Sequence, residues 1–369
     1  MLFSYGRVVT GKLFYDRTKT KAEILKYVKS GQSFMLKAPR RYGKTSLLKH
    51  LLQEQSKEYF YVDFRKTPRL EIFNNRLLEF IYSRMGIKGA MKQLRENAFA
   101  FMRAHNAILS IGVGFFEASI ELYFSNKSQE DKLMEILEYL NELSMESSEP
   151  LYMVFDEFQD AAKLTKEIDF YEALRAEIQH HENICYMFAG SNMTLMTEIF
   201  EKKKAPFYNF CRKKNLAPFD TEELSVEVQK AFRGRGVVFQ SDAILKTLIR
   251  RCGGHPANTM LVLQNIEHKM LDLDTQIITQ EIVDISYGEV QEEMSDLVIE
   301  YLKEIRQKEH LHDVIYREAN KEAHVLEPSS LQQKRKYLVD MGHLQIVERG
   351  KYQIIDNFLR DELLSQNIF

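Results

Sequence analysis

The sequence predicts an α/β fold with an open parallel sheet, followed by a small helical domain and a tail of helices and a hairpin. Near-continuous apolar runs at 151–155 and 184–189 are typical of strands that a parallel sheet buries on both faces. Apolar residues at helical spacing in 133–140 and 168–178 alternate with these runs, and this alternation implies right-handed crossovers. After residue 222 the strand pattern fades, so the sheet is expected before it.

The sheet domain is predicted to span residues 1–220. Its other elements are expected as a helix near 24–28, strands at 33–36 and 59–64, and a helix near 72–81. Residues 87–130 interrupt this pattern and are interpreted as an insertion. Two segments of the insertion, 111–115 and 119–123, are expected to pair as a hairpin.

Two further domains are predicted. Residues 221–290 are expected to form a helical domain, with helices at 243–249 and 260–271 on either side of a Gly-Gly-His-Pro element. Residues 291–369 are expected to form a winged helix-turn-helix domain, because helical patterns precede a short alternating hairpin. The helices are expected near 294–305, 311–315 and 328–341, and the hairpin strands at 343–347 and 352–355.

Composition limits the kinds of partner. The 51 basic and 53 acidic residues nearly cancel, so contact with a polyanion must come from a local patch. The three cysteines are far apart and form neither a disulfide framework nor a metal-binding pattern. No apolar run approaches membrane length, and the first residues lack the layout of a signal peptide. We therefore expect a cytoplasmic protein without a membrane partner.

The clearest chemical motif follows the strand expected at 33–36. It reads Ala38-Pro39-Arg40-Arg41-Tyr42-Gly43-Lys44-Thr45-Ser46 and leads into an amphipathic helical pattern. A strand, a glycine-containing loop and a helix are the context of a phosphate-binding loop, in which backbone N–H groups hold a triphosphate. Lys44 is expected to contact the β- and γ-phosphates, and Thr45 to place its hydroxyl on Mg²⁺. Ala38 stands where the motif asks for glycine, but alanine excludes only part of the backbone space that glycine opens.

Two acids follow the apolar run at 151–155. Because the carboxyl ends of parallel strands open onto the ligand crevice, Asp156 and Glu157 are expected to face the phosphate loop. Asp156 is suited to hold Mg²⁺, and Glu157 to orient and deprotonate a water for attack on the γ-phosphate. An isolated acid pair is also common at solvated turns, and Lys44 upstream favours the catalytic interpretation.

Further candidates surround this pair. Ser191 and Asn192 end the next strand, where they could contact the γ-phosphate or the attacking water, or simply build a turn. Arg40 and Arg41 are candidates either for phosphate contacts or for a solvated or structural role. Arg212 is a candidate arginine finger supplied in trans. It belongs to a basic stretch whose default interpretation is a solvated charge run: Lys202, Lys203, Lys204, Lys213 and Lys214.

A second basic group lies in the tail. Contact with DNA phosphates would use residues of the expected recognition helix and wing, namely Lys334, Arg335, Lys336, Arg349 and Lys351. Winged helices also serve as protein-contact modules, so both interpretations stay open.

The segments 39–47, 156–159 and 253–256 resemble those of prokaryotic AAA-family ATPases common in archaea. This family lies near the STAND group of signalling NTPases and is related to origin-recognition-type ATPases. The resemblance extends over most of the chain, and the double arginine before Gly-Lys-Thr is its most specific part.

The resemblance implies an ASCE-type P-loop NTPase fold, with ATP held between the sheet domain and a helical lid. It implies that Tyr15 and Arg17 line the adenine side, that Pro256 lies near the base, and that His255 is a candidate phosphate sensor. One departure concerns Arg212, because the family's Gly-Arg pair appears here as Cys211-Arg212.

The leading hypothesis is an ATPase switch, in which ATP and Mg²⁺ bind at the loop and the acids, and the helical and winged domains move with the nucleotide state. The first alternative is a DNA-binding protein that uses ATP as a regulatory ligand. The second is a scaffold that forms homo-oligomers or binds a protein partner when ATP is bound.

Overall fold

A computed structural model describes residues 1–81, 83–84, 127–348 and 350–366. The hairpin expected at 111–123 and the wing residue Arg349 lie outside the described residues. In the described part of the chain, no helix is both long enough and apolar enough to span a bilayer.

In the part of the chain that the structure describes, five parallel strands form one sheet in the order β2-β3-β4-β1-β5. They are β1 (Phe34–Lys37), β2 (Tyr59–Asp63), β3 (Leu151–Asp156), β4 (Ile184–Gly190) and β5 (Arg212–Asn215). Every residue of β3 and β4 is buried, which confirms the expected strands with both faces covered. The order places the carboxyl ends of β1, β3 and β4 together at one edge of the sheet.

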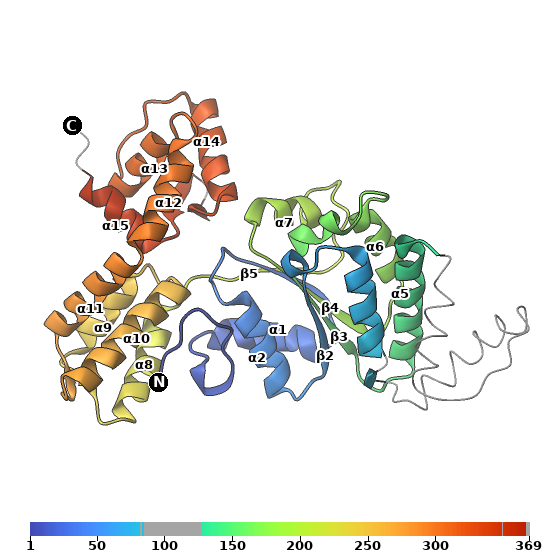
Figure 1. The fold of residues 1–369 in the computed structure, drawn as a ribbon, viewed down its shortest axis with the longest axis horizontal. Helices are drawn as coiled ribbons and strands as arrows, with labels where there is room; N and C mark the ends of the chain where they lie inside the picture. The colour runs from blue at the N-terminus through green and yellow to red at the C-terminus, as the bar shows by residue number, and fades with distance from the viewer. Residues whose placement is uncertain (82, 85–126, 349, 367–369) are drawn as a thin grey trace, which may run out of the picture.

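Helices cover both faces of this sheet (Figure 1). One face is covered by α1 (Thr18–Lys29) and α2 (Lys44–Glu54), whose apolar residues join Leu36 and Val154 in one cluster. The other face is covered by a helix at 70–81 and by α5 (Gln129–Met145), α6 (Phe170–Ile178) and α7 (Met193–Phe200). The domain is therefore a three-layer α/β sandwich.

The start of α6 differs from the sequence prediction. The apolar spacing placed Ile168 in this helix, but the helix begins at Phe170 and Ile168 is 36% exposed. The Asp169 side chain accepts hydrogen bonds from the N–H groups of Tyr171 and Glu172, so it caps the helix and fixes its first residue.

The second region is helical and contains a pair of very short strands. Its elements are α8 (Thr221–Arg233), β6 (Val238–Phe239), α9 (Asp242–Arg251), α10 (Pro256–Asp272), β7 (Ile277–Ile278) and α11 (Gln280–Glu293). The helices expected at 243–249 and 260–271 are α9 and α10. Phe3 is fully buried against Phe232 of α8, so the chain around Phe3 packs with this region.

The tail contains the expected helices and hairpin and ends in a helix that the sequence pattern did not indicate. Its elements are α12 (Ser295–Arg306), α13 (Leu311–Asn320), α14 (Pro328–Asp340), the antiparallel strands β8 (Leu344–Glu348) and β9 (Lys351–Ile354), and α15 (Asn357–Ser365). The tail meets the sheet domain where α14 lies beside α7, and Thr194 donates a hydrogen bond to Asp340 there (Figure 1).

Candidate functional site

The loop between β1 and α2 has the geometry expected of a phosphate-binding loop. Gly43 precedes α2 at φ +82°, a left-handed conformation that favours glycine. The Lys44 ammonium turns back into the loop and donates to the carbonyls of Ala38 at 2.9 Å and Pro39 at 3.1 Å. Burial lowers the pKa of Lys44, while Glu157 and Asp156 act in the opposite direction.

The structure explains why alanine is accepted at position 38. Ala38 is fully buried and is not among the described residues with positive φ, so its backbone does not require glycine.

The other loop residues divide into exposed and buried positions. Arg40 and Arg41 are exposed, and no described acid forms an ion pair with either. Tyr42 is buried, with its hydroxyl 3.5 Å from Gln345 of β8 and its ring edge-on to His255. The loop therefore touches both the helical region and the tail.

The Ser46 side chain is hydrogen-bonded to the segment that precedes α1. Its hydroxyl oxygen accepts a hydrogen bond from the N–H of Val9 at 3.1 Å. The N-terminal segment thus lies against the helix that follows the phosphate loop.

The two acids lie where the sequence placed them, at the end of β3 and beside α2. Asp156 Oδ2 accepts hydrogen bonds from the Thr45 hydroxyl at 2.5 Å and from the Tyr61 hydroxyl at 2.9 Å. Burial raises the pKa of Asp156, against the effects of Thr45 and Lys44. A hydroxyl and a carboxylate in contact supply the oxygen ligands that Mg²⁺ prefers, so Thr45 and Asp156 fit the metal expected from the sequence.

Glu157 is held from several sides. Its Oε2 accepts from the Ser191 hydroxyl at 2.6 Å and the Gln159 side-chain amide at 2.7 Å, and Arg65 lies 3.3 Å from Oε1. Burial alone would raise the pKa of Glu157, but Lys44, Ser191, Gln159 and Arg65 outweigh it and hold the pKa below its ordinary value. The carboxylate is therefore charged at neutral pH, as a general base requires.

Ser191 and Asn192 have different hydrogen-bond partners. Ser191 contacts Glu157 through its hydroxyl and also through its backbone N–H at 3.2 Å. Asn192 accepts a hydrogen bond from the N–H of Leu195 and caps α7. Ser191 thus joins the acids, whereas the Asn192 side chain is used by the helix.

The residues that the resemblance assigned to the nucleotide base have other partners in the structure. The Arg17 guanidinium is buried and donates to the carbonyls of Ala217, Pro218 and Tyr42. The Tyr15 hydroxyl donates to the carbonyl of Leu2 at 2.9 Å. These contacts join the N-terminal segment, the phosphate loop and the connection to α8, and adenine contacts of Tyr15 and Arg17 stay predictions.

His255 and Pro256 begin α10. Pro256 is its first residue, and His255 Nδ1 accepts from the N–H of Asn258 at 3.2 Å. Burial lowers the pKa of His255 to about 4, so the ring is neutral at neutral pH. A phosphate-sensing role for His255 and the position of Pro256 near a base stay predictions.

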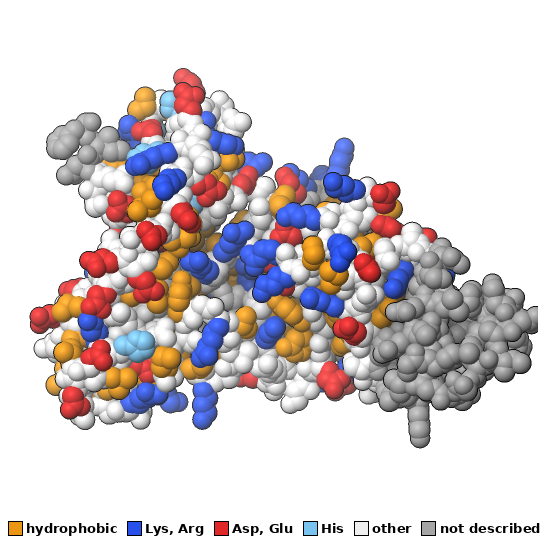
Figure 2. All heavy atoms as spheres, viewed as in Figure 1, with side chains coloured by type: hydrophobic (Ala, Val, Ile, Leu, Met, Phe, Trp, Pro, Cys, Tyr) orange, Lys and Arg blue, Asp and Glu red, His pale blue; other side chains and the backbone are white. Residues whose placement is uncertain are grey.

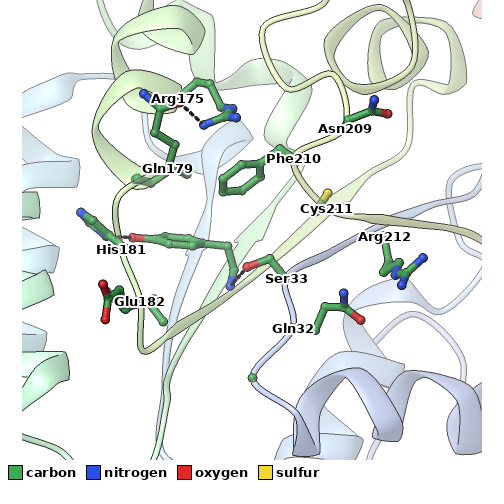
Figure 3. Close-up of a pocket in the computed structure, with 14 residues that line it drawn as sticks. Gln32, Ser33, Arg175, Gln179, His181, Glu182, Asn209, Phe210, Cys211 and Arg212 are labelled. Carbon is green, nitrogen blue, oxygen red and sulfur yellow. Dashed lines mark hydrogen bonds between the residues drawn. The ribbon is translucent and has the colours of Figure 1, made fainter.

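Arg212 lies at the amino ends of the parallel strands, whereas Lys44 lies beyond the carboxyl end of β1. It is the first residue of β5 and pairs with Phe34, the first residue of β1, whereas the phosphate loop follows the last residue of β1. Arg212 is exposed and lines a cavity of about 630 Å³ at the amino end of the sheet (Figure 3). It cannot reach the phosphate loop of its own chain from there, so an action in trans stays a prediction.

Some of the basic residues of the tail form ion pairs with acids of the tail itself. Arg335 pairs with Glu318 at 2.5 Å and lies over the Tyr352 ring, and Lys351 pairs with Glu348 at 2.7 Å. Lys336 is exposed on α14 and Lys334 is half-buried.

No family model matches the chain, and no curated protein matches it in sequence. Solved structures do match its fold. The Walker-type ATPase PABY2304 of Pyrococcus abyssi has a TM-score of 0.66 at 17% identity, over 99% of this chain and 100% of that one. The ORC2 protein of Aeropyrum pernix, solved as ADPNP–ADP complexes, has a TM-score of 0.56 at 12% identity, over 99% and 97%. The chain has the P-loop ATPase fold of the AAA type.

The P-loop fold confirms the predicted fold class, and its sheet order shows what the motif search missed. Tyr61 and Arg65 contact the acids but belong to no motif, and Gln159 lies in the segment 156–159 but was assigned no role there. Tyr61 and Arg65 lie on or just after β2, which pairs with β3, so their contacts follow from a strand order that no local motif contains.

Proposed function

We propose that this protein binds ATP with Mg²⁺ and hydrolyses it, as a molecular switch of the AAA or STAND type. The observation that carries the proposal is the meeting of Lys44, Thr45, Asp156 and Glu157 at one edge of the sheet, with hydrogen bonds joining the last three to their neighbours. A phosphate loop opposite a pair of acids is the arrangement that phosphoryl transfer to water requires.

Each residue has one role in this proposal. The loop N–H groups and Lys44 bind the β- and γ-phosphates, as expected for this motif. Thr45 and Asp156 would hold Mg²⁺, which neutralises charge on the phosphates when bound. Glu157 accepts the proton of the attacking water, and Ser191 keeps its carboxylate in place.

The switching part of the proposal is supported by contacts of the phosphate loop with the other regions. Tyr42 contacts His255 of the helical region and Gln345 of the tail. On the other side of the site, α7 begins at Met193, two residues after Ser191, and contacts α14 through Thr194 and Asp340. Movement of Tyr42 or of α7 would therefore change the contacts of the sheet domain with the tail.

The test is ATP hydrolysis by E157Q. Nucleotide binding, followed with a fluorescent ATP analogue, is expected to persist, while phosphate release falls about a hundredfold or more, the usual contribution of a general base. E172Q, at an exposed position of α6, is the matched control and should keep full turnover. Turnover that E157Q leaves undiminished would remove Glu157 from the mechanism.

A second candidate function is DNA binding through the tail, with ATP as a regulatory ligand. The observation that favours it is a helix, α14, that presents Lys336 next to an antiparallel hairpin, as in a winged helix. Duplex binding at several salt concentrations tests it, since loss of the salt dependence in K334Q/K336Q would support it and absence of any binding would exclude it.

A homo-oligomer is the third candidate, and Arg212 would then supply a guanidinium to the site of the next copy. Its exposed position at the amino end of β5, away from the phosphate loop of its own chain, suits such a contact. Light scattering with and without ATP tests this, and an unchanged mass counts against it.

A further inference from the structure

The segment between α7 and β5 carries an unusual concentration of positive charge. The charges of the whole chain nearly cancel, but residues 202–214 contain six cations and no acid: Lys202, Lys203, Lys204, Arg212, Lys213 and Lys214. Figure 2 shows that Lys and Arg side chains gather over the middle of one face of the molecule, and the cations of this segment are identified by their positions in the sequence. Such a local excess is what a near-neutral protein needs to attract a polyanion.

Most of these charges are not neutralised within the described residues. Lys202 pairs with Glu198, and Lys214 pairs with Glu23. The remaining four have no described acid within ion-pair distance, and all are exposed: Lys203, Lys204, Arg212 and Lys213. The patch therefore keeps a net positive charge at its surface.

An aromatic side chain lies among these cations. Tyr208 is 38% exposed, and the Lys213 ammonium lies 5.3 Å from the centroid of its ring. Successive turns hold the segment. The Ala205 N–H donates to the backbone carbonyl of Lys202, and the Tyr208 N–H donates to the backbone carbonyl of Ala205. Phe207, fully buried, anchors it in the apolar core. Tyr208 is thus presented on a fixed support.

The cavity of about 630 Å³ adjoins this segment (Figure 3). The Arg175 guanidinium lies 4.6 Å from the centroid of the Phe210 ring and donates to Gln179 at 2.8 Å, so its position is fixed. Polar residues of the lining include the amides Gln32 and Asn209, the cation Arg212, the acid Glu182, and His181, whose pKa burial lowers to about 4. The lining offers hydrogen-bond donors and acceptors beside an aromatic ring and a guanidinium, which suits a nucleobase.

We propose that the surface of residues 203–213, with the adjoining cavity, binds single-stranded nucleic acid. The free lysines contact phosphates, Tyr208 stacks on one base, and the cavity accepts another. A single strand fits better than a duplex, because an aromatic ring and a concave pocket need unstacked bases. The surface is separate from the ATP site and from the tail, and the proposal does not depend on ATP hydrolysis.

Protection of the sheet edge does not explain the whole pattern. β5 is an edge strand, and charged residues on edge strands oppose pairing with other chains. This accounts for Arg212 and Lys213. Lys203, Lys204 and Tyr208 lie outside the strand, so they need another reason for their exposure.

The test is fluorescence anisotropy of a fluorescein-labelled single-stranded oligonucleotide, a mixed-sequence 12-mer, with the full chain at several salt concentrations. K203Q/K204Q is expected to weaken binding and to reduce the slope of log K against log salt by about 1.4, since each phosphate contact on a single strand contributes about 0.7. K230Q/R233Q removes two exposed cations from α8, in the helical region, and is the matched control, with binding unchanged.

The aromatic and cavity contacts have their own readouts. Y208A is expected to weaken binding by roughly fivefold to a hundredfold, the usual effect of losing one stacked base, while Y208F keeps the ring and the affinity. An otherwise identical abasic strand is expected to bind more weakly than the strand with bases. Thermal unfolding midpoints of all variants establish that the fold is intact.

Several results would overturn the proposal. They are absence of binding to the 12-mer, equal affinity for the corresponding duplex, an unchanged salt slope in K203Q/K204Q, and unchanged affinity in Y208A. If K203Q/K204Q alters only the mass of the protein in light scattering, the surface is a contact with a second copy of the chain and not a nucleic-acid site.

Discussion

The Tyr61 hydroxyl donates to Asp156 Oδ2 at 2.9 Å, the same oxygen that accepts from Thr45. The phenol ring is fixed on its other side by the Lys49 ammonium, 3.9 Å from the ring centroid. Asp156 Oδ1 accepts the N–H of Glu157, so both carboxylate oxygens are held. Tyr61 is therefore a positioning residue for the carboxylate that we assign to Mg²⁺.

We predict that Y61F weakens Mg²⁺ binding without weakening nucleotide binding in its absence. Partners that orient a metal ligand typically contribute on the order of tenfold in metal affinity. The measurement is a Mg²⁺ titration of the fluorescent ADP complex, with nucleotide affinity in EDTA measured separately. Y59F is the matched control, because Tyr59 lies two residues earlier on β2 and does not contact Asp156. An identical Mg²⁺ midpoint for Y61F and the wild type would contradict the assignment, provided that the wild type binds Mg²⁺ and nucleotide.

Ser191 and Asn192 are neighbours in sequence but should respond differently to substitution. Ser191 donates to Glu157, so S191A is expected to lower ATP turnover on the order of tenfold, the scale typical of orienting partners, with little change in stability. Asn192 caps α7, so N192A is expected to lower the free energy of unfolding by about 1 kcal/mol and to leave turnover per folded molecule unchanged. Urea denaturation and steady-state ATPase assays on both variants separate the effects, and a reversed pattern would show that the two roles are misassigned.

The sequence predicted the parts of the fold that depend on local hydrophobic pattern. β3 and β4 were recognisable because strands covered on both faces must be apolar throughout. β5, with the sequence Arg-Lys-Lys-Asn, has no such pattern, since it pairs with β1 at the edge of the sheet and its side chains are largely exposed. The hydropathy pattern cannot reveal a strand whose side chains are exposed and which is held in the sheet by backbone hydrogen bonds alone.

The same distinction applies to the site. Lys44, Thr45, Asp156 and Glu157 were found because each lies in a local motif that chemistry requires. Tyr61 contacts Asp156 across 95 positions of sequence, and this contact follows only once β2 is known to lie beside β3. Strand order is a property of the packed sheet, so residues supplied by a neighbouring strand were out of reach of a motif search.

His255 predicts a pH dependence of stability. Burial lowers its pKa from 6.5 to about 4, although Asp356 acts in the opposite direction and Arg41 adds to the lowering. Between these pH values the unfolded chain binds a proton that the folded chain does not, so this residue lowers stability as the pH falls from 6.5 towards 4. The full effect is about 3 kcal/mol, since one pKa unit corresponds to about 1.4 kcal/mol.

The variant H255N tests this dependence. Asparagine keeps a side-chain acceptor for the first turn of α10 but does not titrate. The difference in unfolding free energy between wild type and H255N is expected to change in favour of H255N as the pH falls from 7 to about 4. Comparing two proteins removes the contributions of other groups, including Asp16, whose pKa burial raises to about 6 and which acts in the opposite direction. A difference that is independent of pH would show that the pKa of His255 is the same in the folded and the unfolded chain, and would contradict the prediction.

Arg17 connects three parts of the chain through a geometry that lysine cannot reproduce. Its guanidinium donates to carbonyls of the phosphate loop and of the connection to α8, and lies 4.8 Å from the centroid of the Phe219 ring. Burial lowers its pKa to about 10, so it stays charged at neutral pH. R17K keeps the charge but loses the planar fork, which leaves buried carbonyls without donors.

We expect R17K to lower the free energy of unfolding by about 1–3 kcal/mol, the cost of leaving buried polar groups unsatisfied. Urea denaturation measures this, and R7K is the matched control because Arg7 is exposed and its Nε donates only to the nearby Ser4. Since Arg17 holds the Tyr42 carbonyl, nucleotide affinity should also fall in R17K and not in R7K. Loss of stability with unaltered nucleotide affinity would confine Arg17 to the connection between domains, and unchanged stability would contradict the structural role altogether.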